Sequence, residues 1–227
     1  MANVSHELRS PLTALSGFVE TLQGAAANDK VARERFLDMM SNEADRMARL
    51  IGDLLSLSKL QASERVAPTD RVDLFRILSS VSSSLSGLAD ANKVKLKLDF
   101  SNSMPLVTGD SDELTQVFQN LIENAIKYSG NGSTVSVSFA PPKQGKSHLC
   151  IMVEDTGEGI EPTQIPRLTE RFYRVDKGRS RAQGGTGLGL AIVKHILIRH
   201  RGWLKISSQL EKGSIFAVYL PVSKEKD

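Results

Sequence analysis

The 227-residue sequence has a single cysteine, Cys150, so no disulfide framework exists and a reducing compartment such as the cytosol is expected. No apolar run approaches the ~18 to 20 residues of a membrane span, and no signal-peptide pattern is present. The formal net charge is only +3 and the basic residues are dispersed, which does not favour a dedicated nucleic-acid surface. We therefore expect a soluble cytoplasmic chain without direct nucleic-acid or membrane contact, long enough for one large domain or two small ones.

The N-terminal region has the periodicity of two amphipathic helices joined by a turn at residues 24–29, with Asp29 as the N-cap of the second helix. Apolar residues at spacings of three and four form one stripe on each helix: Leu8, Leu12, Leu15, Val19 and Leu22 on the first, and Phe36, Met40, Ala44, Met47, Ile51, Leu54 and Leu57 on the second. Charged residues, Arg46 and Arg49 among them, lie off the second stripe. Because two helices bury too little surface alone, we expect a dimer that closes a four-helix bundle.

A polar segment with one proline follows, and we place a linker at residues 64–70 between a helical domain (1–63) and an α/β domain (71–227). Strand patterns occur at 94–100, 134–139, 149–155, 203–207 and 214–220, and helix patterns at 111–127 and 188–201. This order predicts an α/β sandwich with one helical layer on a mixed sheet. Trp203, which begins a strand, is expected to pack against the last helix.

His6 lies about 160° from the centre of the first apolar stripe, so it is predicted to face solvent. An exposed neutral imidazole is a competent nucleophile at neutral pH. The adjacent Glu7 could hold the proton of one ring nitrogen and leave the other nitrogen free to attack. Pro11 removes the N–H that would bond the carbonyl of Glu7, which predicts a bent or loosened helix there. The alternative is an ordinary surface histidine beside a plain kink.

Asn120 and Asn124 are four residues apart and therefore share one face of the predicted helix at 111–127. Two amide oxygens on one face can coordinate a hard cation, directly or through water. Glu123 and Lys127 flank them, and Lys127 can meet a phosphate as a point charge. The alternative is a polar outer helix face without a ligand.

Two glycine-containing segments complete the candidate site. Asp155 ends a predicted strand and opens DTGEGI, where it could accept a hydrogen bond from an adenine amine, although such segments also form ordinary turns. Glycines at 184, 185, 187 and 189 lead into a helix, an arrangement that binds anions through free N–H groups and the helix dipole. The segment is neither a P-loop nor a dinucleotide-binding pattern. The preceding residues 170–183 are rich in arginine, which indicates either a cationic lid over phosphates or a solvated loop.

In this order, SHELRSPL (5–12), NLIENAIKYS (120–129), DTGEGI (155–160), ERFYRV (170–175) and GTGLGL (185–190) resemble the H, N, first G, F and second G boxes of bacterial two-component sensor histidine kinases. The resemblance covers the whole chain. It implies a dimerisation and phosphotransfer hairpin followed by an ATP-binding domain of the gyrase/Hsp90/histidine kinase/MutL type, with ATP:protein-L-histidine phosphotransferase activity. The H box and RFYRVD are similar to those of the phosphate-regulon sensor kinases, which pair with winged-helix response regulators.

The resemblance also implies residue roles. His6 would accept the γ-phosphoryl group, Glu7 would act as base, and Ser10, where the family commonly has Thr or Asn, could orient a water in a phosphatase reaction. Asn120 and Asn124 would serve Mg²⁺ and the phosphates of ATP, with Asn124 as the direct ligand. The other residues implied in nucleotide binding are Lys127, Tyr128, Asp155, Gly157, Gly159, Ile160, Arg174, Arg179, Gly185, Thr186, Gly187, Leu188 and Gly189.

Two other functions remain open on the sequence: an ATP-gated clamp of the same superfamily, and a scaffold that keeps the fold without kinase activity. The clamp proteins lack a helical hairpin bearing His-Glu before the ATP domain, and intact Asn124 and Asp155 argue against the scaffold. The histidine kinase hypothesis implies two partners, a second copy of the chain in a homodimer and the receiver domain of a response regulator. Phosphatase activity on that regulator is a further expectation. The hypothesis also implies a parent protein anchored in the inner membrane, with this part in the cytoplasm.

Overall fold

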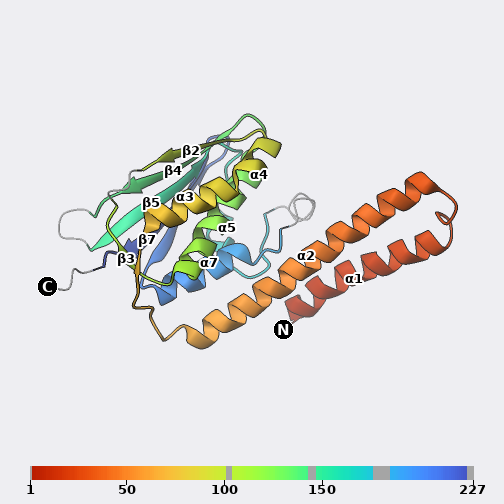
Figure 1. Ribbon diagram of the computed structural model, residues 1–227, viewed down its shortest axis with the longest axis horizontal. Helices are drawn as coiled ribbons and strands as arrows, with labels where there is room; N and C mark the ends of the chain where they lie inside the picture. The colour runs from red at the N-terminus through yellow and green to blue at the C-terminus, as the bar shows by residue number, and fades with distance from the viewer. Residues whose placement is uncertain (1, 101–103, 143–146, 176–184, 224–227) are drawn as a thin grey trace.

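The computed structural model describes residues 2–100, 104–142, 147–175 and 185–223. The chain begins with a long helical hairpin, formed by α1 (Ala2–Gln23) and α2 (Lys30–Ser63), as predicted (Figure 1). The Asp29 side chain accepts a hydrogen bond from the N–H of Ala32 at 3.0 Å, which confirms the N-cap. α1 continues as one helix through Pro11. Among the described residues, no helix combines the length and apolar character needed to cross a bilayer.

The remainder of the chain forms a five-stranded sheet of order β2-β4-β5-β7-β6, in which β2 and β4 are parallel and the other pairs antiparallel. Its elements are β1 (Arg71–Val72), α3 (Leu74–Ser84), α4 (Ser86–Ala91), β2 (Lys95–Asp99), β3 (Val107–Thr108), α5 (Ser111–Ser129), β4 (Thr134–Ala140), β5 (His148–Asp155), the short 3₁₀ helix η1 (Ile165–Arg167), α7 (Gly189–Arg199), β6 (Trp203–Gln209) and β7 (Gly213–Pro221). Helices α3, α5 and α7 cover one face of the sheet (Figure 1). The prediction of a single helical layer on a mixed sheet is confirmed.

Helix α5 organises the core and, on its other side, the candidate site. Its predicted apolar face is buried, with at most 3% exposure at Leu114, Val117, Phe118, Leu121, Ile122 and Ala125. The Asp110 side chain caps the helix by accepting hydrogen bonds from the N–H groups of residues 112 and 113. Because the apolar face is held against the sheet, the polar residues on the opposite side of α5 keep a constant orientation.

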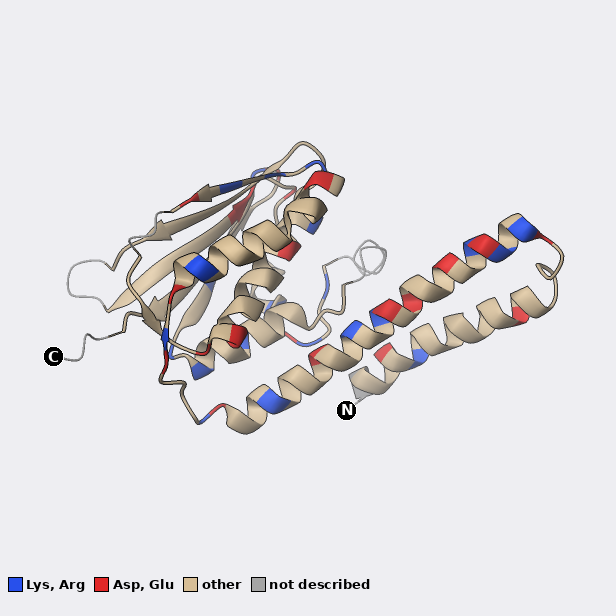
Figure 2. Cartoon of the chain, viewed as in Figure 1, with Lys and Arg blue, Asp and Glu red and all other residues tan. Residues whose placement is uncertain are grey.

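The second helix of the hairpin also packs on the α/β domain, mainly against α7. Leu50, Leu57 and Leu60 are buried in the same apolar core as the helices of that domain. The connection after α2 is held by Arg199, whose Nε donates a hydrogen bond to the carbonyl of Val66 at 2.9 Å. Charged residues of both signs are spread along α2, whereas α1 carries few (Figure 2). α2 therefore packs against α1 on one side and α7 on another. The single apolar stripe predicted for α2 did not indicate the second neighbour.

One expectation about packing was wrong, and one small sheet was not predicted. Trp203 does not pack on the last helix: it is 46% exposed and stacks on Tyr219, its neighbour on β7, with ring centroids 4.8 Å apart. Alternate residues of β6, such as Leu204, contact the core, so Trp203 must lie on the open face of the sheet. The small sheet of β1 and β3 was not predicted, because two-residue strands are too short to show alternation.

Candidate functional site

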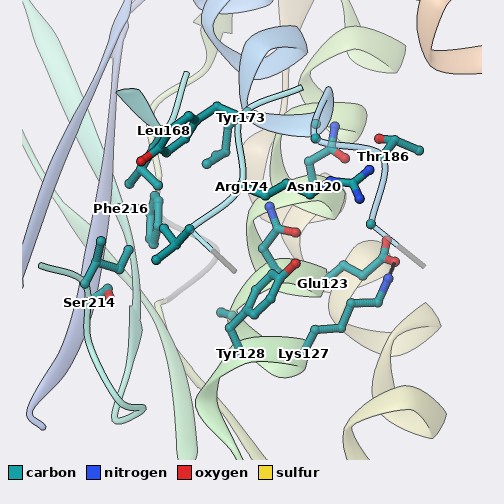
Figure 3. A pocket seen from close by; sticks show the side chains of 18 of the residues that line it. Asn120, Glu123, Lys127, Tyr128, Leu168, Tyr173, Arg174, Thr186, Ser214 and Phe216 are labelled. Atoms are coloured by element: carbon teal, nitrogen blue, oxygen red, sulfur yellow. Dashed lines mark hydrogen bonds and ion pairs between the residues drawn. The ribbon is translucent and has the colours of Figure 1, made fainter. Parts of the chain in front are cut away.

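A cavity of about 510 Å³ lies where α5, β7, the segments after β5 and the turn before α7 meet α2. Figure 3 shows that its labelled side chains come from segments far apart in the sequence and face one space. The volume is in the range of small-molecule sites. The cavity has a mostly apolar end and a charged end, which is the arrangement that a nucleotide with a flat base and a polyphosphate requires.

The apolar end contains a buried carboxylate, Asp155. Ile160 lines the cavity as well, and Figure 3 shows Leu168 and Phe216 at this end. Asp155 is 7% exposed, and its Oδ1 accepts a hydrogen bond from the N–H of Gly157 at 2.9 Å. Burial raises the pKa of Asp155, while hydrogen bonds from the backbone of Gly157 and Ser214 oppose the rise. A fixed carboxylate in apolar surroundings suits recognition of a ring amine.

The glycines beside Asp155 are required by close backbone contacts. A Cβ on Gly159 would lie 2.1 Å from the carbonyl oxygen of Gln209, and the residue has φ +73°. A Cβ on Gly157 would lie 2.7 Å from the Cα of Ser129, so Gly157 sits behind Asp155 against the end of α5. These glycines hold the Asp155 turn tightly between α5 and β6.

The charged end is formed by the polar side of α5. Asn120, Glu123, Asn124 and Lys127 all line the cavity, and Lys127 forms an ion pair with Glu123 (Figure 3). Tyr128 lines the cavity as well and is 37% exposed. The amide and carboxylate oxygens of this face are hard donors that suit Mg²⁺ with a phosphate-bearing ligand. The residues therefore fit the magnesium and ATP expected from the sequence.

The glycine turn before α7 lies directly against α5. A Cβ on Gly189 would be 3.0 Å from Oδ1 of Asn120, so this glycine lets the first turn of α7 approach the amide. Gly187 has φ +74°, and its carbonyl accepts a hydrogen bond from the N–H of Phe172 at 2.8 Å. Gly185 and Thr186 line the cavity too, whereas the side chain of Leu188 is fully buried in the core.

The predicted phosphoacceptor His6 and its neighbour Glu7 lie on α1. His6 is exposed, as predicted, and Ser10 is half-buried on the same helix. Oε2 of Glu7 lies 3.7 Å from Nη2 of Arg46 on α2 and 3.8 Å from Nη2 of Arg174. Arg174 also lines the cavity. The residue next to His6 is thus in contact with the wall of the cavity in the same chain.

The structure brings most of the predicted residues to one place. Those that line the cavity are Asn120, Asn124, Lys127, Tyr128, Asp155, Gly159, Ile160, Arg174, Gly185, Thr186, Gly187 and Gly189. Gly157 and Leu188 lie beside it. Arg179 falls outside the described residues.

Sequence reasoning missed three residues of α2. Arg49 and Asp53 line the cavity, and Arg46 is buried, with 4% exposure, between Glu7 and Glu43. A signal was present, because Leu60 lies about 60° beyond Leu57, at the edge of the predicted stripe, and therefore widens the apolar face of α2. A wide apolar face can contact a second neighbour, and charged residues at its edge are then brought into the interface.

Comparison with known families agrees with this geometry. Residues 109–224 match the model of the histidine kinase-, DNA gyrase B- and HSP90-like ATPases, and residues 1–63 match that of the His Kinase A (phospho-acceptor) domain. The chain therefore belongs to the histidine kinase-type ATPase family and has the phospho-acceptor hairpin in front of the ATPase domain. The matches give no support to a clamp of the superfamily, because the hairpin domain is present.

Among curated relatives, the phosphate regulon sensor protein PhoR of Pseudomonas aeruginosa is 42% identical over 96% of the chain, which spans 48% of that protein. The sensor-like histidine kinase SenX3 of Mycolicibacterium smegmatis is 43% identical over 97% of the chain, which spans 56% of that protein. The chain thus covers about half the length of these relatives. The solved structure of the Acinetobacter baumannii histidine kinase AdeS matches 96% of the chain with a TM-score of 0.75 and 26% identity, and the chain covers 98% of it.

Proposed function

We propose that this chain is the core of a sensor histidine kinase, which phosphorylates His6 with ATP and passes the phosphoryl group to an aspartate of a response regulator. The observation that carries the proposal is the contact between Glu7 and Arg174. It connects the residue beside an exposed histidine to the wall of a nucleotide-sized cavity within one chain. A clamp or a scaffold needs the cavity but has no use for a histidine presented next to it.

In this reaction the side chains divide into a nucleotide set and a transfer set. Asp155 would accept a hydrogen bond from the adenine amine, and Asn124, supported by Asn120, would hold Mg²⁺. The unprotonated ring nitrogen of His6 would attack the γ-phosphorus, so that a P–N bond forms as the bond to the ADP oxygen breaks, and Glu7 would take the proton of the imidazole. Bound ATP would supply the phosphoryl group, and Mg²⁺ held by Asn124 would neutralise the charge that develops on the leaving oxygens.

The partners follow from the exposed surface of the hairpin and from the relatives. Large apolar side chains remain exposed on α1 and α2, among them Leu12 at 57%, Leu37 at 53% and Leu55 at 67%. A second copy of the hairpin would cover them in a four-helix bundle. One structural neighbour, a histidine kinase called ThkA in complex with the response regulator TrrA, has a TM-score of 0.78 at 22% identity over the whole chain, which covers 62% of that neighbour's length. By the resemblance to phosphate-regulon kinases, we expect a regulator with a winged-helix output domain and a parent protein anchored in the inner membrane.

Incubation of the protein with γ-labelled ATP and Mg²⁺ tests the proposal. A phosphohistidine is labile to acid and stable to alkali, so the label should show that pattern and should move to a receiver domain added afterwards. The first prediction is that His6→Gln abolishes the label and leaves nucleotide affinity unchanged, because the residue lies on the hairpin outside the cavity. His148→Gln is the matched control and should keep the label. Label that persists on His6→Gln refutes the assignment.

A further inference from the structure

A hydrogen bond joins α2, the second helix of the hairpin, to the glycine turn of the cavity. The hydroxyl of Thr186 donates to Oδ2 of Asp53 on α2 at 2.6 Å. The same hydroxyl accepts from the backbone N–H of Leu188 at 3.3 Å. We call this Asp53–Thr186 pair the interdomain latch. It holds the turn that leads into α7 directly against a residue of the other domain.

The carboxylate of the latch lies in an unfavourable place for an anion. Asp53 lines the cavity, where burial raises its pKa, and Glu123 across the cavity raises it further. The hydrogen bond from Thr186 and the charge of Arg49 act in the opposite direction. Partial burial weakens the screening of charge by water. A polyphosphate entering this end would therefore meet a carboxylate that is poorly screened and already committed to Thr186.

We propose that Asp53 is an affinity-setting residue of the nucleotide site. In the nucleotide-free protein it holds the glycine turn through the interdomain latch, and a bound polyphosphate competes with it for that turn. The inference rests on the proposed nucleotide function and adds that a residue of the phosphotransfer domain opposes binding. By thermodynamic reciprocity, if the interdomain latch lowers the affinity for nucleotide by some factor, bound nucleotide weakens the latch by the same factor.

The competing possibility is that Asp53 helps to hold the nucleotide through a cation, since carboxylate oxygens are good Mg²⁺ ligands. The two roles predict opposite effects of removing the charge. A carboxylate that repels the polyphosphate makes binding weaker, so its removal strengthens binding. A carboxylate that carries the cation makes binding stronger, so its removal weakens binding.

The test compares Asp53→Asn and Asp53→Ala with the wild-type 227-residue protein, using calorimetry with a non-hydrolysable ATP analogue and Mg²⁺. Asparagine keeps an oxygen that accepts from Thr186 and loses the charge, whereas alanine loses both. Asp45→Asn is the matched control, because Asp45 is an exposed carboxylate on α2 outside the cavity. We expect tighter binding, about five- to tenfold for Asp53→Asn and more for Asp53→Ala, and no change for Asp45→Asn.

Amide hydrogen exchange in the nucleotide-free protein provides the second readout. Asp53→Ala should speed exchange at the N–H groups of the turn, Leu188 in particular, and Asp53→Asn should leave it near the wild-type rate. Unchanged or weaker nucleotide binding in both variants overturns the proposal. Failure of the wild-type protein to bind nucleotide refutes the proposed function instead, so the two failures are distinguishable.

Discussion

The replacement Asp155→Asn tests the most specific part of the candidate site, the recognition of adenine. In the wild-type protein, Asp155 presents only acceptor oxygens at the apolar end of the cavity. Oδ1 is fixed by the N–H of Gly157 at 2.9 Å. The asparagine oxygen can keep that bond, and the new NH₂ group then presents a donor to the adenine amine, which is also a donor. One hydrogen bond is replaced by a mismatched pair.

An unpaired polar contact of this kind costs about 1 to 3 kcal/mol. Since 1.4 kcal/mol corresponds to a factor of ten, the affinity should fall about 5- to 150-fold. The loss should be the same for ATP and ADP, because both present the same base. Two effects on folding oppose each other. The amide avoids the burial penalty that raises the pKa of Asp155, but it has only one oxygen for the backbone groups of Gly157 and Ser214, which both donate to the carboxylate.

Calorimetric titration with ADP and with a non-hydrolysable ATP analogue measures this loss, and a thermal melt of the same samples reports on folding. Glu154→Gln is the matched control, since it removes the same charge from the adjacent, exposed residue on the opposite face of β5. The control should bind like the wild type. Wild-type affinity in Asp155→Asn would refute adenine recognition by this residue, and a loss confined to the ATP analogue would place Asp155 near the phosphates instead.

Three further predictions concern other parts of the molecule. Asn124→Ala should remove the Mg²⁺ dependence of nucleotide affinity while binding without Mg²⁺ persists, and calorimetry with and without the metal checks it. Ser10→Ala should lower phosphatase activity on a phosphorylated regulator more than autokinase activity, and equal loss of both would indicate damage to α1. Burial lowers the pKa of His200 below its ordinary value of 6.5. As the pH falls, the unfolded chain therefore binds a proton at this histidine before the folded chain does, and the free energy of unfolding should decrease as the pH drops through about 6.5. His200→Gln should have a shallower slope in denaturant titrations between about pH 7 and pH 5, and an unchanged slope would contradict the assignment.

The features that sequence predicted best are those whose cause is local. The period of 3.6 on α5 predicted both its apolar face and the common side of Asn120 and Asn124, because one rotation angle determines both. The long strands β4, β5 and β7 alternate or run apolar over enough residues to be recognised. The two-residue strands of the small sheet carry no such signal, and they form because the chain on both sides is already held in place.

The side of a strand that an aromatic residue takes is harder to predict than the strand itself. On sequence alone, Trp203 is expected to pack against the last helix. Its position in the alternation instead follows Leu204, which takes the core side and leaves Trp203 on the open face with Tyr219. The register of β6 against β7 decides the outcome, and register depends on the pairing partner rather than on the composition of the strand.

Arg46 shows why part of the packing around α2 was beyond prediction. On the helical wheel of an isolated hairpin it lies off the apolar stripe, where a charged residue is expected to meet water. In the structure α2 is covered on two sides, and burying a cation there is tolerable only if anions accompany it. Glu43, three residues earlier, is a partner that spacing could have indicated, with Nη1 to Oε1 at 2.7 Å. Glu7 lies on the other helix, α1, and becomes a partner only because of the angle at which α1 and α2 pack. The periodicity of neither helix predicts that angle.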